Sequence, residues 1–334
     1  MEMRLVSDTV STRVKKFAGE LWALGAVFGY SGANLFGRAG VATGNPIAGP
    51  LLRAVPSLLM GLLLGWRGKQ YRQLLPGDTR YVGSRLLLVF VGSGLISVIG
   101  TFAFFFALHI GGVDIAVPVL QTQLIWGSLF AWIMLGERVN ARGVLGILVT
   151  FAGLVVLALG QSQGVPVSNN WYWGLGLALI PAIAWGFSGV VWRYGQQRGM
   201  ERSSGITIQY GTAVVASALF LLFSGQLGVY RTIGVGDFTA LLVSGVFGGV
   251  IAVFCMFTAM KLLPAATVFV LNGLTPLVTA LGGGLFLHEN VNGLMWLGIL
   301  LASVGVVLFQ LTAAVGQGPP RQATAAPGES EALP

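Results

Sequence analysis

The sequence predicts an all-α membrane protein in which ten transmembrane helices form two inverted repeats of five helices each. The 334-residue chain is 55% hydrophobic and only 9% charged, with a mean hydropathy of +0.81. A soluble domain of this size cannot bury that much apolar surface. Apolar windows of about 20 residues, enough to span a hydrocarbon core of ~30 Å, recur along the chain. The second half of the sequence also repeats the first.

The first five windows predict the helices Ala18–Phe36, Pro46–Trp66, Leu86–Leu108, Ile115–Leu135 and Ala141–Leu159. The second five predict Trp173–Trp192, Gly205–Phe223, Phe238–Met260, Ala265–Leu287 and Gly293–Ala313. Tight connections are expected at Gly111-Gly112 and at Leu263-Pro264.

The repeat is clearest at an offset of 152 residues. At this offset Leu135–Val155 falls on Leu287–Val307 with ten identical positions. A second match pairs Phe28–Gly32 with Trp185–Gly189, both reading aromatic, Gly, aromatic, Ser, Gly. We therefore divide the chain into a first repeat, 1–160, a second repeat, 161–315, and a tail, 316–334, whose Pro, Ala and Gln content predicts a disordered cytoplasmic segment.

The cations predict the orientation, because Lys and Arg near helix ends stay on the cytoplasmic side. With the N-terminus inside, sixteen of the 19 cations fall on one face, and only Arg38 and Arg231 fall on the other. This predicts a multi-pass protein of the plasma membrane with both termini in the cytoplasm. An odd number of helices per repeat inverts the second copy, an arrangement that secondary transporters use for alternating access. The net charge of +8 is thus a topology signal, and no nucleic-acid partner is expected.

Several motifs accompany the ten-helix, five-plus-five pattern: Gly136-Glu137 and His288-Glu289 closing helices four and nine, the repeated aromatic-Gly-aromatic-Ser-Gly segment, Arg53, Phe105–Leu108 and Pro276. Together these features resemble the EamA-type drug/metabolite transporter superfamily. The resemblance covers about Ala18 to Leu311. Within the superfamily the chain is most similar to a YddG-type exporter, which implies export of aromatic and other apolar amino acids.

Polar side chains inside two predicted helices indicate a binding site, because facing hydrocarbon is costly for them. Helix four carries Gln121, Thr122 and Gln123, and helix nine carries Asn272 and Thr275 beside Pro276. Proline removes a backbone donor and frees a carbonyl, and such irregular backbone is tolerated where it lines a cavity. The alternative is that these amides join helices, at about 1 kcal/mol each.

Aromatic rings well inside helices one, four and six complete the predicted site. They would suit an apolar or aromatic solute, or hold a cation over the ring face, and the alternative is packing against protein or lipid. The predicted substrate-binding residues are Tyr30, Gln121, Gln123, Trp126, Trp185, Ser188, Asn272 and Thr275.

The titratable groups favour facilitated diffusion over proton coupling. No Asp or Glu lies at the middle of a predicted helix, and His109, at a helix end, is a remote candidate for a proton carrier. Glu137 and Glu289 each precede an asparagine that suits a helix N-cap, which predicts a structural role. Arg53 inside helix two is expected to bind a helix-end carbonyl, with a substrate carboxylate as the alternative.

Two other functions compete with amino-acid export. One is a multidrug exporter of hydrophobic cations from the same superfamily. The other is an intramembrane serine protease, suggested by Gly-x-Ser at Ser31 and Ser188, with His109 and His288 as the available histidines. A single cysteine and the lack of a Walker or metal motif predict no cofactor. The expected partners are a small-molecule substrate and the lipid bilayer, and a monomer is expected to suffice.

Overall fold

The computed structural model describes residues 2–41, 45–137, 139–161, 171–279, 281 and 292–313, and within these ranges the chain is helical without a strand. The helices of the first half are α1 (Glu2–Val41), α2 (Gly49–Arg67), α3 (Ser84–Leu120), α4 (Gln123–Leu135) and α5 (Ala141–Gln161). Those of the second half are α6 (Trp171–Gln197), α7 (Arg202–Phe223), α8 (Val229–Thr232), α9 (Val235–Gly245), α10 (Val253–Leu262), α11 (Ala265–Asn272) and α13 (Gly293–Ala313). The predicted tail, 316–334, lies outside the described residues.

The described chain contains five stretches long and apolar enough to cross a membrane: Pro46–Arg67, Ser84–Ala107, Trp173–Gln197, Arg202–Phe223 and Val235–Leu262. Four shorter apolar helices cover Gln123–Leu135, Ala141–Leu157, Ala265–Thr279 and Gly293–Phe309. The bounds predicted for the last helix, Gly293–Ala313, are confirmed.

The boundary predicted between helices three and four is wrong as a helix end. Helix α3 continues through Gly111-Gly112 to Leu120. Phe104 and Leu120 nevertheless pack in one cluster with Ala182, whereas a straight helix would hold residues 104 and 120 about 24 Å apart. The chain therefore bends back within α3. The change of direction predicted between helices three and four occurs in part inside this one helix.

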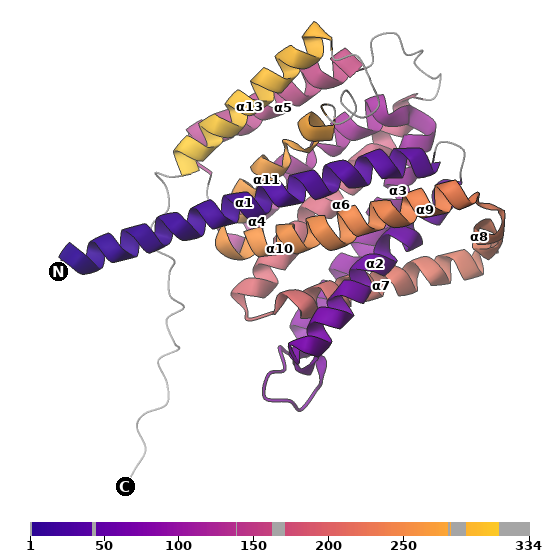
Figure 1. The fold of residues 1–334 in the computed structure, drawn as a ribbon, viewed down its shortest axis with the longest axis horizontal. Helices are drawn as coiled ribbons and strands as arrows, with labels where there is room; N and C mark the ends of the chain where they lie inside the picture. The colour runs from indigo at the N-terminus through magenta and orange to yellow at the C-terminus, as the bar shows by residue number, and fades with distance from the viewer. Residues whose placement is uncertain are drawn as a thin grey trace.

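The eighth predicted helix is built from three pieces. A π-helical segment, Val246–Ala252, joins α9 to α10, and the two lie along one line in Figure 1. Gly249 explains the close packing on α2, since a β-carbon there would lie 2.0 Å from Ser57 Oγ. Such π segments are frequent at functional sites.

Helices α5 and α13 pack against each other along one edge of the molecule (Figure 1). A β-carbon on Gly153 would lie 2.2 Å from the Ala302 nitrogen, and one on Gly305 would lie 2.2 Å from the Thr150 nitrogen. Gly153 and Gly305 are 152 residues apart, so the repeated glycine builds both sides of the contact. Close backbone approach of this kind is how helices associate in lipid. A run of three glycines at 282–284 lies outside the described residues.

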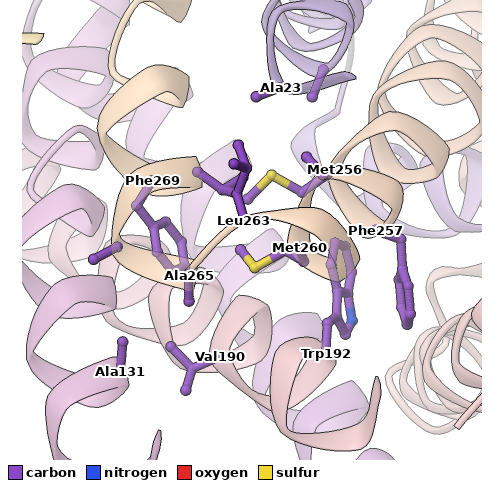
Figure 2. Close-up of a cluster of buried hydrophobic side chains, with 14 of the residues drawn as sticks. Ala23, Ala131, Val190, Trp192, Met256, Phe257, Met260, Leu263, Ala265 and Phe269 are labelled. Atoms are coloured by element: carbon purple, nitrogen blue, oxygen red, sulfur yellow. The ribbon is translucent and has the colours of Figure 1, made fainter. Parts of the chain in front are cut away.

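The largest core cluster joins helices of both halves. Figure 2 shows Ala23 of α1 and Ala131 of α4 together with Trp192, Met260 and Phe269 of the second half. All five side chains are buried. Trp192 and Phe269 also line the cavity described below, so this core supports one wall of the candidate site.

Candidate functional site

One cavity lies between helices of the two halves, with a volume of about 120 Å³. A single water needs roughly 10–15 Å³, so the space suits a small solute. Its described polar lining consists of Tyr30, Asn34, Arg53, Ser97, Thr101, Gln121, Gln123, Ser188, Gln209, Tyr210, Ser217, Asn272 and Thr275. Its described aromatic walls are Trp185, Trp192 and Phe269.

The structure brings seven of the eight sequence-predicted residues to this cavity: Tyr30, Gln121, Gln123, Trp185, Ser188, Asn272 and Thr275. Trp126 is not among the described lining residues. It packs instead against the cluster of Phe104, Leu120 and Ala182. The position of Trp126 well inside a helix does not tell whether its ring lines a cavity or packs against other side chains.

Two helix breaks open onto the cavity at equivalent places in the repeats. Residues Gln121 and Thr122 form a turn between α3 and α4, and Gly273 and Leu274, 152 residues later, form a turn after α11. Gln123 and Thr275 follow the two breaks and both line the cavity. Interrupted helices of this kind place backbone carbonyls and amides at a site that lipid cannot reach.

A hydrogen-bonded chain of side chains joins α3, α6 and α7 along one wall. The Trp192 indole N–H donates to Gln209 Oε1, and the amide of Gln209 donates to Ser97 Oγ at 3.3 Å. Ser97 Oγ lies 2.9 Å from Ser188 Oγ, which also donates to the Ser93 carbonyl at 3.3 Å. The predicted Ser188 hydroxyl is therefore held in place by neighbours.

The break after α11 is held by a second set of bonds. Ser31 Oγ donates to the Thr275 carbonyl at 3.0 Å, which ties α1 to the break. Thr275 Oγ1 donates to Asn272 Oδ1 at 3.2 Å. The two serines of the Gly-x-Ser segments thus have Thr275, Ser93 and Ser97 as partners. No histidine joins them in the described part of the chain, and His109 is exposed.

Arg53 is the one charged side chain among the described lining residues. Its guanidinium carbon lies 5.3 Å from the centre of the Trp185 ring and 5.9 Å from that of Phe104. Among the described residues Arg53 donates no hydrogen bond to a helix-end carbonyl, so the carbonyl partner that we expected is not found there. The rings cover the cation, and Trp is the aromatic side chain that binds a cation most strongly.

Glu137 reaches across to the second repeat. Its Oε2 accepts the backbone N–H groups of Ala265 at 2.8 Å and Ala266 at 3.4 Å, which are the first residues of α11. Its Oε1 lies 3.5 Å from Arg193 Nε. Burial raises the pKa of the Glu137 carboxyl, while Arg193 and the two amides oppose the shift. A carboxylate at a helix N-terminus satisfies orphan donors and suits the helix dipole.

The structural role predicted for Glu137 therefore holds, but its target is α11 and not the helix that follows it. Asn140 caps that helix, since its Oδ1 accepts the Gly143 N–H at 2.7 Å. Asn292 caps α13 through the Met295 N–H at 2.9 Å. Glu289 lies outside the described residues.

Several lining residues were not predicted, among them Asn34, Ser97, Thr101, Gln209 and Tyr210. Ser97 and Thr101 are four residues apart and so share a helix face, which is a signal the sequence did carry. Gln209 and Tyr210 interrupt an apolar helix in the same way as the glutamines of helix four.

Comparison with known proteins agrees with this architecture. The family model described as the EamA-like transporter family matches residues 17–159 and again residues 172–311. The chain belongs to the EamA-like transporter family. As a member, this EamA-like protein is a membrane-embedded, multi-pass transporter of small solutes and not an enzyme.

Solved structures support the fold alone. A crystal structure that is 20% identical superposes with a TM-score of 0.72 and covers 90% of this EamA-like chain and 99% of its own. Among curated proteins no match was found. The family model, and not the solved structure, confirms the EamA-type resemblance seen in the sequence.

Proposed function

We propose that this EamA-like protein exports small neutral solutes, with apolar and aromatic amino acids as the leading class, as YddG-type transporters do. The observation that carries the proposal is a cavity lined from both repeats by amides, hydroxyls and rings, with seven of the predicted residues around it. Amides and hydroxyls satisfy a carboxylate and an ammonium, and the rings of Trp185, Trp192 and Phe269 cover an apolar side chain.

Such a lining replaces water around a zwitterion only in part, so we expect weak binding. Apart from Arg53 the described polar lining is neutral, and neutral groups offset the desolvation of two charges incompletely. A dissociation constant on the order of millimolar, or about 4 kcal/mol, follows. Several neutral amino acids should then compete for the same site.

We infer facilitated diffusion by alternating access, because the described lining carries no carboxylate and no histidine. Proteoliposomes should take up labelled phenylalanine without an imposed proton gradient. Uptake that requires a pH gradient and is lost in His109→Ala would contradict this mechanism.

We also propose ten membrane spans in two inverted repeats, with both termini in the cytoplasm. The cation distribution supports this topology. A cysteine introduced between Gln161 and Asn170 should be labelled from outside the cell, and one introduced between Lys69 and Arg80 should not. Labelling of both from one side would contradict the inversion.

Competition in proteoliposomes tests the substrate class. Labelled phenylalanine should be displaced by methionine and threonine, but neither by a sugar phosphate, since one cation is too few for a phosphate clamp, nor by a quaternary ammonium dye. The dye is the hydrophobic-cation alternative, and Arg53 in the cavity weighs against it by like-charge repulsion. Competition by the dye and by no amino acid would reject the YddG-type function and favour the multidrug alternative.

A further inference from the structure

We infer that Arg53 anchors the carboxylate of the transported solute, so that the cavity selects solutes carrying one carboxylate. The inference rests on the proposed function, because it names the chemical group that the same cavity recognises.

The first step is the lack of a protein partner for this cation. Arg53 has cation–ring contacts with Trp185 and Phe104, but neither a hydrogen-bond acceptor nor an acidic side chain among the described residues. A guanidinium carries five N–H donors. A cation inside a membrane helix without an acid is costly and marks a functional site by default.

The second step is the geometry of the guanidinium. The rings contact it through cation–ring interactions, which engage the faces of the aromatic systems and leave its N–H groups free to donate. Its Nη2 is also close to Gly248 of the π segment, where a β-carbon would lie 3.4 Å away. An N–H edge of this kind matches the two oxygens of a carboxylate, which arginine binds in a bidentate manner.

The third step is an acceptor without a partner in the same cavity. Gln121 is only 2% exposed and lines the cavity, yet its Oε1 makes no hydrogen bond in the described chain. The preceding Leu120 packs in one cluster with Phe104, and Trp185 packs against that cluster. Phe104 and Trp185 are the two rings that contact Arg53. Buried acceptors are normally satisfied. This one suits the ammonium group of an amino acid whose carboxylate lies on Arg53.

The fourth step is that the two repeats are unequal here. The residue 152 positions after Arg53 is Gly205, and the rings of Phe257 and Phe90 occupy the space beside it. The second repeat therefore supplies no matching cation. One carboxylate is held in one orientation, which excludes dicarboxylates from the class.

Four related compounds test the inference: phenylalanine, 3-phenylpropionate without the ammonium, phenylalaninamide without the carboxylate, and phenethylamine. Binding is measured as thermal stabilisation of the purified protein in detergent, which needs no transport. Phenylalanine and 3-phenylpropionate should stabilise the wild type. The two compounds without a carboxylate should require at least about a tenfold higher concentration, equivalent to about 1.4 kcal/mol.

The variants are Arg53→Gln, Arg53→Lys and Arg67→Gln. Arg53→Gln should bind all four compounds about equally, and Arg53→Lys should restore part of the preference through its charge. Arg67→Gln is the matched control, because Arg67 ends the same helix and is exposed. The melting temperature of each variant without ligand shows whether it folds.

The outcomes separate the two proposals. Carboxylate-dependent binding that Arg53→Gln removes supports the inference even if phenylalanine is not transported, in which case the proposed function fails alone. Equal stabilisation by phenylalaninamide, an unchanged preference in Arg53→Gln, or phenylalanine transport without any carboxylate-dependent binding would overturn the inference.

Discussion

The two ends of α2 are held to the second repeat by different chemistry. At the end near Arg67, which we call the polar end (70–74 with 199–204), Gln73 donates to the Gly199 carbonyl and accepts the Glu201 N–H, both at 2.9 Å. Ser204 Oγ donates to the Gln70 carbonyl at 2.9 Å, and Ser203 Oγ donates to Gln70 Oε1. Hydrogen bonds between side chain and backbone therefore dominate this end.

The opposite end, which we call the apolar end (46–52 with 226–232), is packed mainly by hydrocarbon. Ala48, Leu52, Leu221, Val229 and Leu241 are buried there in one cluster with Phe105. One hydrogen bond accompanies them, from Tyr230 Oη to the Ala48 carbonyl at 3.1 Å.

Under the proposed inverted repeat these ends are equivalent, since Ala48 and Met200 are 152 residues apart and belong to opposite ends. The same structural position is thus closed by either chemistry. Water replaces hydrogen bonds at a net cost of about 0.5–1.5 kcal/mol each, whereas opening an apolar contact exposes surface at roughly 25 cal/mol per Å². We expect mutations at the apolar end to have the larger effect.

Leu241→Ala should lower the stability of the protein most. Leu241 is 1% exposed within the apolar cluster, and a cavity at such a site costs about 2–4 kcal/mol. Thermal unfolding in detergent measures the loss, with exposed Leu222→Ala as the control. A cost below that of the Gln73 variant would contradict the ranking of the two ends.

Gln73→Leu should come next. It removes two hydrogen bonds and leaves the Gly199 carbonyl and the Glu201 N–H without their partner, at a cost of about 2 kcal/mol. Gln226→Leu, an exposed glutamine at the other end, is the control. Wild-type stability in Gln73→Leu would mean that the polar contacts contribute nothing.

Tyr230→Phe should lower stability by about 1 kcal/mol, because it removes one hydrogen bond and leaves the ring in place. The same unfolding measurement applies. A loss larger than that of Leu241→Ala would show that the hydroxyl, and not apolar packing, closes this end.

The ends should also differ in their response to pH, which is the smallest expected effect. The Arg80 N–H and the Arg72 side chain lower the pKa of Asp78. The stabilising contribution of Asp78 to the segment 72–80, beside the polar end, is therefore present above about pH 4 and lost as the pH falls further. Burial raises the pKa of Tyr230 to about 12, so its contribution is present below about pH 10 and lost as the pH rises through 12.

A spin label at Tyr71→Cys should therefore become mobile in acid, and one at Leu227→Cys only in strong alkali. Both positions are exposed. The opposite assignment of acid and alkali would contradict the two pKa shifts.

The sequence predicted those site residues whose polar side chains are costly to place in an apolar helix. Gln121 and Asn272 stand out because an amide in an apolar helix needs a partner or a cavity. Pro276 indicated irregular backbone in helix nine, whereas the two equivalent breaks, at Gln121 and Gly273, required the structure.

The remaining parts depend on contacts between distant residues. Trp126 and Trp185 are both rings inside helices, and only the packing of α4 on α6 decides which one lines the cavity. Glu137 bonds to amides 128 and 129 residues away, and Arg53 is defined by the rings of two other helices. No local pattern specifies such partners.

The most direct test is to measure distances at the two ends in one preparation. Spin labels at Tyr71 and Gln197 report on the polar end, and labels at Asn45 and Leu227 report on the apolar end; all four positions are exposed, and a Cys255→Ala background removes the one native thiol. If the ends are alternating gates around one cavity, phenylalanine should lengthen the distance at one end while the other stays short. Lengthening at both ends together, or at neither, would contradict the account of two alternating gates.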